Sequence, residues 1–116
     1  MKFKKKFSFH TRKKESYKIR QKYPERIPVI VEQPYNPSLP TLNKHKFLVN
    51  QDMTIGQFIY TLRKRISLNP ETAIFLYVSD SFLPTTNSTL LDVYYNYKDE
   101  DGFLYCTLVG ENTFGY

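Results

Sequence analysis

Residues that could perform catalytic chemistry are few in this sequence, and they do not form a known motif. The chain has two histidines, His10 and His45, and a single cysteine, Cys106. Neither histidine belongs to a nucleophile, zinc or acid–base signature. Cys106 would need a neighbouring histidine to become a thiolate nucleophile, and the alternation of its strand favours a position in the core. We therefore do not expect an enzyme.

Three adjacent acids, Asp99, Glu100 and Asp101, are a second candidate for chemistry. Neighbouring carboxylates on one turn do not converge on a cation in the way that spaced ligands do. We therefore expect no metal site and no bound cofactor.

The C-terminus offers a different kind of chemistry, because Gly115 precedes the final residue, Tyr116. If Tyr116 were removed, the chain would end in a carboxylate beside a residue without a Cβ atom. Such an end fits a narrow enzyme tunnel and leaves its carbonyl open to a nucleophile. By position alone, the better explanation is that Gly115 is one of four glycines and merely falls near the end of the chain.

The charge is distributed unevenly along the chain. Residues 1–65 contain sixteen of the seventeen basic residues and four acids, whereas residues 66–116 contain one basic residue and seven acids. The basic half would attract acidic peptides, anionic lipids or nucleic acids, although a solvated surface explains the same charges. Phe3, Phe7 and Phe9 among the lysines could stack on bases, enter a membrane interface or pack on the domain. Nucleic-acid binding is a distant alternative, because the nearest aromatic motif, at residues 102–105, follows three acids that would repel phosphate.

The length of 116 residues predicts one globular domain. The longest apolar run, residues 73–78, has six residues, and a membrane-spanning helix needs about 20. The N-terminal lysines lack the apolar stretch of a secretory signal. A single cysteine fits a reducing compartment, so we expect a cytoplasmic protein.

The pattern of apolar residues predicts an α+β chain. One or two short helices are expected within residues 1–23, and a capping box of Thr54 and Gln57 begins a clear helix that ends near Arg65. Strands are expected at 27–32, 45–49, 73–78 and 103–109, and a short helix at 88–97. This order is that of the ubiquitin-like β-grasp, with a four-stranded mixed sheet, one main helix and an N-terminal helical extension. We divide the chain into an extension (1–23), a ubiquitin-like domain (24–110) and a tail with a processing site (111–116).

Several segments resemble one family in order along the chain, from about Phe9 to the end. The sequence is similar to the ubiquitin-like autophagy modifiers, which include the GABA receptor-associated protein and the microtubule-associated light chains. The matching segments are residues 18–32, 46–49, 54–58, 63–66, 101–105 and 110–115.

The resemblance implies a modifier. In this family a cysteine protease cleaves after the glycine that matches Gly115 and removes the residue that matches Tyr116. Activating and conjugating enzymes then transfer the new carboxylate to phosphatidylethanolamine, and the lipidated protein recruits cargo receptors to the autophagosome membrane. The unlipidated chain is expected to be a monomer. The alternative is an unconjugated ubiquitin-fold adaptor for cytoskeletal or trafficking partners.

The resemblance also implies a peptide-binding groove at the edge of the second strand, for an aromatic residue, two variable residues and a branched aliphatic residue. Its aromatic pocket would consist of Glu15, Ile19, Pro28, Ile30, Lys46, Leu48 and Phe103. Its aliphatic pocket would consist of Phe47, Val49, Met53, Phe58 and Thr61. Acids next to the motif would meet Arg26, Lys44, Lys46 and Arg65.

Two residues depart from the family pattern in this groove. Asn50 replaces a usual proline, and Thr61 replaces a large aliphatic residue. We expect Thr61 to make the aliphatic pocket smaller or more polar.

Overall fold

The computed structural model describes residues 2–34 and 39–110. Their helices and strands follow the predicted order, with ends within two residues of the predicted ones for the four strands and the two later helices. The elements are α1 (Lys2–Lys6), α2 (Phe9–Lys22), β1 (Arg26–Glu32), β2 (Lys46–Asn50), α3 (Ile55–Arg65), β3 (Ile74–Val78), α4 (Leu90–Tyr97) and β4 (Leu104–Gly110). The extension forms one short helix and one helix of 14 residues, and the division into three segments stays a prediction.

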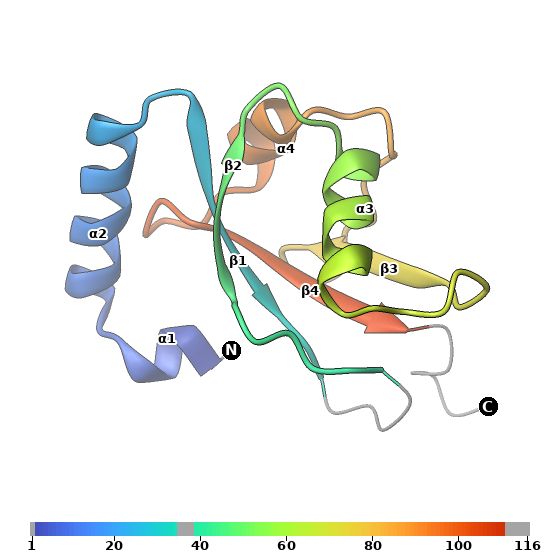
Figure 1. Cartoon of the computed structure of the whole chain (residues 1–116). Helices are drawn as coiled ribbons and strands as arrows, with labels where there is room; N and C mark the ends of the chain where they lie inside the picture. Colours follow the sequence, from blue (N-terminus) through green and yellow to red (C-terminus); the bar gives the residue numbers. More distant parts are fainter. Residues whose placement is uncertain (1, 35–38, 111–116) are drawn as a thin grey trace.

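The four strands form one mixed sheet, as predicted, and their order in it is β2-β1-β4-β3. β1 runs antiparallel to β2 and parallel to β4, and β3 runs antiparallel to β4. Figure 1 shows α2 on one side of these strands and α3 on the other. β2 is therefore an edge strand, and its neighbour β1 lies inside the sheet.

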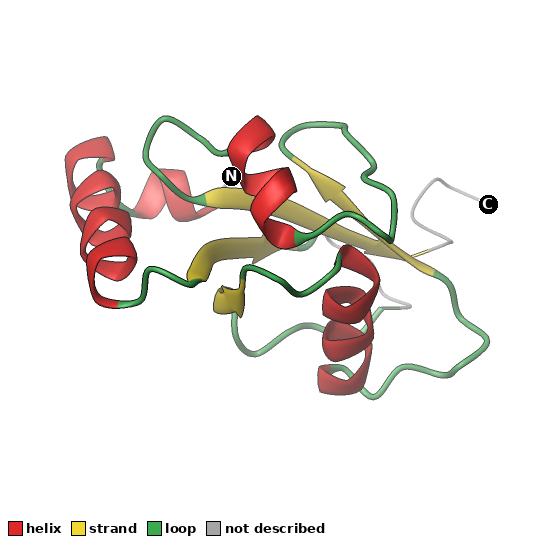
Figure 2. Ribbon diagram, turned by 90° about the horizontal axis from the view of Figure 1, so that it is seen from above, coloured by secondary structure: helices red, strands yellow, loops and turns green. Residues whose placement is uncertain are grey.

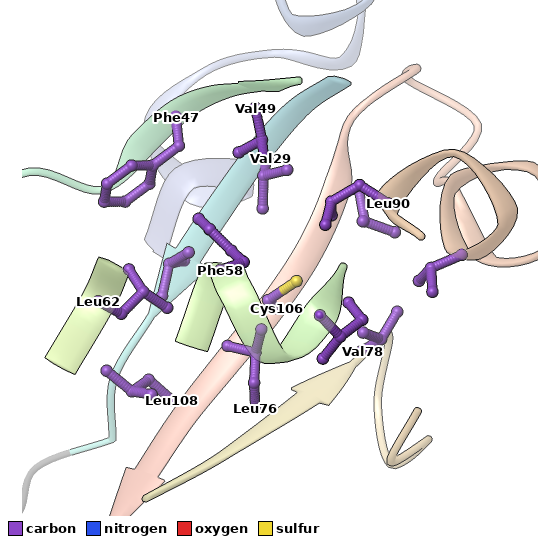
Figure 3. Packing of buried hydrophobic residues seen from close by; sticks show 14 of the residues in the cluster. Val29, Phe47, Val49, Phe58, Leu62, Leu76, Val78, Leu90, Cys106 and Leu108 are labelled. Atoms are coloured by element: carbon purple, nitrogen blue, oxygen red, sulfur yellow. The ribbon is translucent and has the colours of Figure 1, made fainter. Parts of the chain in front are cut away.

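One face of the sheet forms the main core with α3 and α4. Alternate residues of a strand point to opposite faces, and Val29, Phe47 and Cys106 all point to this one (Figure 3). Phe58 and Leu62 of α3 are at most 1% exposed against it. The predicted burial of Cys106 is confirmed, and burial raises the pKa of its thiol to about 12. At neutral pH this cysteine is a core thiol rather than a nucleophile.

The N-terminal helices cover the opposite face, and in the view of Figure 2 α2 lies at the left with the twisted strands between it and α3. A second apolar cluster forms here from Ile30, Phe103 and Tyr105, with Phe3 and Ile19 packed against it. The Phe3 ring lies 5.3 Å from the Phe103 ring between centroids. Of the three readings of the N-terminal phenylalanines, the packing of Phe3 supports a helix docked on the domain.

A buried polar network fastens α2 to the turn before β4. Asp101 is fully buried and accepts hydrogen bonds from Arg12 Nη1 and the Tyr105 hydroxyl, both at 2.5 Å. The Ser16 hydroxyl donates to the backbone carbonyl of Asp101. Burial and the bond to Asp101 raise the pKa of Tyr105, so its hydroxyl stays protonated and donates. Asp101, one of the three acids for which we expected no metal site, therefore holds α2 of the N-terminal extension in place.

Gly102 is required where this turn meets α2. Its φ of +91° favours glycine, and a Cβ atom there would lie 2.3 Å from Ser16 Oγ. The close approach of α2 to the turn therefore depends on a residue without a side chain.

Docking of α1 is expected to weaken in acid. Partial burial raises the pKa of Asp99, but hydrogen bonds from Lys4 Nζ (2.5 Å) and from the Asp101 N–H (3.1 Å) outweigh it and lower the pKa overall. A carboxyl group whose pKa is lower in the folded protein than in the unfolded chain stabilises the fold at pH values above its pKa in the unfolded chain. This stabilisation is lost as the pH falls through the pKa of the carboxyl group in the folded protein. Exchange of the Phe7 amide hydrogen, which bonds to the Phe3 carbonyl, should accelerate from about pH 5 to about pH 3 beyond its intrinsic pH dependence.

The Asp99→Asn variant tests the origin of this pH dependence. Its α1 helix should exchange rapidly already at neutral pH and change less on acidification. Asp52→Asn removes an exposed carboxylate far from α1 along the chain and should behave like the unmodified protein. If Asp99→Asn kept the full pH dependence, another carboxylate would control the docking of α1.

Candidate functional site

The candidate site follows the edge strand β2, whose residues alternate between the two faces of the sheet. Leu48 lies opposite Pro28, and Lys46 lies opposite Ile30. Among the described strands, β2 pairs with β1 alone. The outer backbone edge of β2 therefore has the geometry that accepts an added strand.

The residues assigned to the aromatic pocket gather on the face that carries α2. Ile19, Ile30 and Phe103 belong to one apolar cluster. Glu15 of α2 forms an ion pair with Lys46 of β2, and both side chains are exposed enough to be reached. Elements from both halves of the chain thus build this part of the site: α2, β1, β2 and β4.

The residues assigned to the aliphatic pocket lie on the opposite face, toward α3. The rings of Phe47 and Phe58 pack edge to face at 5.7 Å between centroids. Phe47, Val49 and Phe58 are at least 94% buried, whereas Met53 and Thr61 are half-buried. The first three residues are thus part of the core, and a ligand would meet mainly Met53 and Thr61 at the rim.

The contacts of Thr61 bear on what we expect of this pocket. Its hydroxyl donates to the Gln57 carbonyl at 3.1 Å, a bond within α3. The bond commits the hydroxyl to its own helix, and the expectation of a smaller or more polar pocket stays a prediction.

The cations assigned to the acidic flank of the motif lie at two places. Lys44 and Arg65 flank the Phe47 ring, with their charged groups 5.2 and 5.3 Å from its centroid. Lys46 begins β2 and forms its ion pair with Glu15 of α2 on the opposite face of the sheet. Arg26 instead pairs with Asn50 at the far end of β2, four residues or about 13 Å from the Ile30–Lys46 pair. The Arg26 side chain reaches back along β2, where its Nη1 donates to the Leu48 carbonyl at 3.4 Å.

The spacing of the expected peptide motif fits this division between two faces. Its aromatic and aliphatic residues are three positions apart, and an odd separation in an extended chain places side chains on opposite sides. A peptide added along the β2 edge would therefore direct one side chain toward α2 and the other toward α3. A single extended peptide can reach both assigned pockets only if an odd number of positions separates its aromatic and aliphatic residues.

The proposed processing residues Gly115 and Tyr116 lie outside the described residues. The described chain ends with β4 at Gly110, which pairs with Ile74.

The described residues contain no group of three His, Cys, Asp or Glu side chains placed to hold a metal ion. His45 is engaged through Nδ1 with the Val31 carbonyl at 3.0 Å. Over the same ranges, none of the helices has both the length and the apolar composition that crossing a bilayer requires. What the described surface offers is a site for binding along an edge strand.

The mixed sheet, the main helix α3 and the helical extension define a ubiquitin-like protein. A family model described as "Autophagy protein Atg8 ubiquitin like" matches residues 11–115. The chain is 54% identical over 113 residues to autophagy-related protein 8 of Mycosarcoma maydis, covering 97% of this chain and 95% of that protein. It is 52% identical over 113 residues to the Schizosaccharomyces pombe protein of the same name, covering 97% and 93%. The chain belongs to the Atg8 family of autophagy proteins.

Solved structures support the fold over nearly the whole chain. The Trypanosoma brucei ATG8 crystal structure has a TM-score of 0.90 and 42% sequence identity, covering 99% of this chain and 98% of that one. A Plasmodium falciparum Atg8, solved in complex with a P. falciparum Atg3 peptide, has a TM-score of 0.83 and 39% identity, covering 92% and 94%. The predicted ubiquitin-like fold is thereby confirmed.

Proposed function

We propose that this protein is a ubiquitin-like modifier that is processed after Gly115 and conjugated to phosphatidylethanolamine. Membership of the Atg8 family supports this proposal most directly, since the family match extends to residue 115. The modifier has no catalytic role of its own. The reactive atom is the carboxyl carbon of Gly115, which activating and conjugating enzymes pass through thioesters to the lipid amine.

The lipid gives the protein its membrane attachment. A phospholipid has two acyl chains, and stable anchoring of a soluble domain requires about that much buried hydrocarbon. The basic N-terminal half would favour approach to an anionic surface. We propose a cytoplasmic pool and a lipidated pool on autophagosome membranes.

The β2 edge would serve as the recognition surface for receptors. Main-chain hydrogen bonds to an edge strand supply affinity, and side-chain pockets on its two faces supply specificity. The related P. falciparum Atg8 was solved with an Atg3 peptide, which fits our proposal that partners of the conjugation system also present peptides to this chain.

The intact mass of the protein from its own cells tests the proposal. We expect a population without Tyr116 and a second population that has gained a phospholipid. If the mature protein always retained Tyr116, conjugation would be excluded, and an unconjugated adaptor would be the better description.

Binding at the edge strand predicts a loss of affinity when its exposed face is truncated. The double variant Lys46→Ala with Leu48→Ala removes two side chains of the aromatic pocket and should weaken peptides with the motif by about 1–3 kcal/mol in calorimetry. A matched control, Tyr95→Ala with Lys98→Ala, removes an exposed aromatic residue and a lysine from the region of α4. Equal affinities of the two double variants would rule out this location for the groove.

A further inference from the structure

A hollow of about 430 Å³ lies where the N-terminal extension meets the rest of the domain. Side chains from α1, α2, the loop after β3, the end of α4, the turn that follows it and β4 line the hollow. Its volume falls within the range of about 300–1,000 Å³ that is typical of small-molecule sites. It shares no lining residue with the assigned peptide groove, so it is a separate candidate site.

Charges of both signs line this hollow in equal number. The cations are Lys4, Arg12 and Lys98, and the carboxylates are Asp80, Asp99 and Glu100. An anion alone would face three carboxylates there, and an ammonium ion alone would face three cations. A ligand that carries both charges can place each charge beside its opposite. The lining therefore favours a small zwitterion.

Two of the cations are fixed at the buried part of the hollow. Arg12 is 8% exposed, and it donates through Nε to the Phe7 carbonyl at 3.0 Å and through Nη1 to Asp101 at 2.5 Å. A guanidinium group has five N–H donors, so these two bonds leave further donors for an anionic group. Lys4 pairs with Asp99, and its Nζ lies 4.8 Å from the centroid of the Tyr105 ring. This part of the hollow offers positioned donors to a phosphate or a carboxylate.

The exposed part of the hollow offers acceptors to an ammonium group. Asp80 follows β3 and Glu100 follows α4, and both residues are exposed. Neither of them belongs to an ion pair in the part of the chain that the structure describes. Their carboxylates are therefore not committed to a cation of the protein itself.

The loop after β3 is held in one shape before any ligand binds. Val78 and Phe82 exchange both of their backbone hydrogen bonds, at 2.7 and 3.1 Å, and the Ser79 N–H donates to the Tyr105 carbonyl at 2.9 Å. The Phe82 ring stacks on the Tyr97 ring at 4.2 Å between centroids. A preformed wall lowers the loss of conformational entropy on binding.

We infer that this hollow binds a small zwitterion, with its anionic group beside Arg12 and Lys4 and its ammonium group beside Asp80 and Glu100. The two N-terminal helices supply one wall of the hollow, and the loop after β3 and the turn after α4 supply the other. The ligand therefore also holds the N-terminal extension against the domain. This inference depends neither on lipid conjugation nor on the peptide groove.

Three probes separate the two charges of the ligand. O-Phosphoethanolamine carries both charges, inorganic phosphate carries only the anionic group, and ethanolamine carries only the ammonium group. In an NMR titration that follows the Ser79 amide, phosphoethanolamine should bind at least about tenfold more tightly than either of the other two, because it gains a charge-assisted interaction. If phosphate or ethanolamine bound as tightly as phosphoethanolamine, or if none of the three bound, the inference would be overturned.

A matched pair of double variants locates the ammonium group. The Asp80 and Glu100 side chains make no hydrogen bond within the described residues, so Asp80→Asn with Glu100→Gln should keep the fold. This variant should reduce the advantage of phosphoethanolamine over phosphate to less than about twofold. The control, Asp52→Asn with Asp92→Asn, removes two exposed carboxylates that are absent from the lining and should keep the full advantage. An advantage that persisted in the first variant would contradict the assigned position.

Hydrogen exchange tests whether the ligand holds the extension. The Phe7 amide, which bonds to the Phe3 carbonyl, should exchange more slowly with saturating phosphoethanolamine and at the original rate with ethanolamine. Unchanged exchange in the presence of bound phosphoethanolamine would overturn this bridging role.

Vesicles distinguish the two sources of such a zwitterion. If phosphatidylcholine vesicles displaced phosphoethanolamine only when they contained phosphatidylethanolamine, the ligand would be a lipid headgroup. If neither kind of vesicle displaced it, the ligand would be a soluble zwitterion. Both results support the hollow as the site, whereas equal displacement by the two kinds of vesicle would contradict recognition of a primary ammonium group.

Discussion

Gly115→Ala is expected to abolish processing and lipid attachment while the domain remains folded. An enzyme tunnel that fits a glycine chain end has no space for a Cβ atom, and a methyl group beside the carbonyl hinders the attacking nucleophile. Gly115 lies beyond β4, the last described strand, so the substitution should leave the thermal unfolding midpoint unchanged. In cells, a gel shift and the intact mass should show a single unconjugated species that retains Tyr116.

Three further variants make this result specific. A chain that ends at Gly115 bypasses the protease and should be conjugated normally, whereas the same truncated chain with Gly115→Ala tests conjugation alone. Asn112→Ala changes another residue of the tail and should be processed and lipidated. A normal conjugate from full-length Gly115→Ala would contradict the proposal.

Asp101→Asn is expected to give the largest loss of stability. Asparagine can keep the oxygen that accepts the Phe103 N–H, but an amide NH2 then replaces the oxygen that accepts from the Tyr105 hydroxyl and from Arg12. Arg12, which is 8% exposed, is left without its countercharge. Removing one partner of a buried ion pair costs about 3–5 kcal/mol. Urea unfolding should show this as a lower midpoint with an unchanged slope.

The neighbouring acid and the paired variant provide the controls. Glu100→Gln changes an exposed carboxylate in the same turn and should alter stability by less than about 0.5 kcal/mol. Arg12→Met combined with Asp101→Asn removes both charges and should recover much of the loss. If the double variant were as unstable as the sum of the single ones, the two charges would not form a coupled pair.

Most of the fold could be predicted from local patterns. The capping box of Thr54 and Gln57 begins α3 as expected, with both of its hydrogen bonds formed. The strands expected at residues 27–32 and 45–49 correspond to β1 and β2, with ends that differ by one residue at most. These signals succeed because helix caps and the apolar patterns of strands act over a few residues.

The candidate site could be predicted only in part. Its residues were assigned by resemblance, and those assignments stay predictions, but the separation of Arg26 from Lys44 and Lys46 was not foreseen. The network of Arg12, Ser16, Asp101 and Tyr105 was missed altogether. Nothing local distinguishes Asp101 from its neighbours Asp99 and Glu100, yet it is buried and Glu100 is exposed.

The amino-acid sequence by itself determined the kinds and order of the elements, the concentration of positive charge in residues 1–65 and the glycine next to the last residue. Each of these follows from composition or from contacts within about one turn or one strand. Only the tertiary structure decided which faces the side chains share. Arg12 meets Asp101 across 89 positions of the chain, and Lys4 meets Asp99 across 95. Such contacts depend on how the layers pack, and packing brings together residues whose separation along the chain carries no local signal.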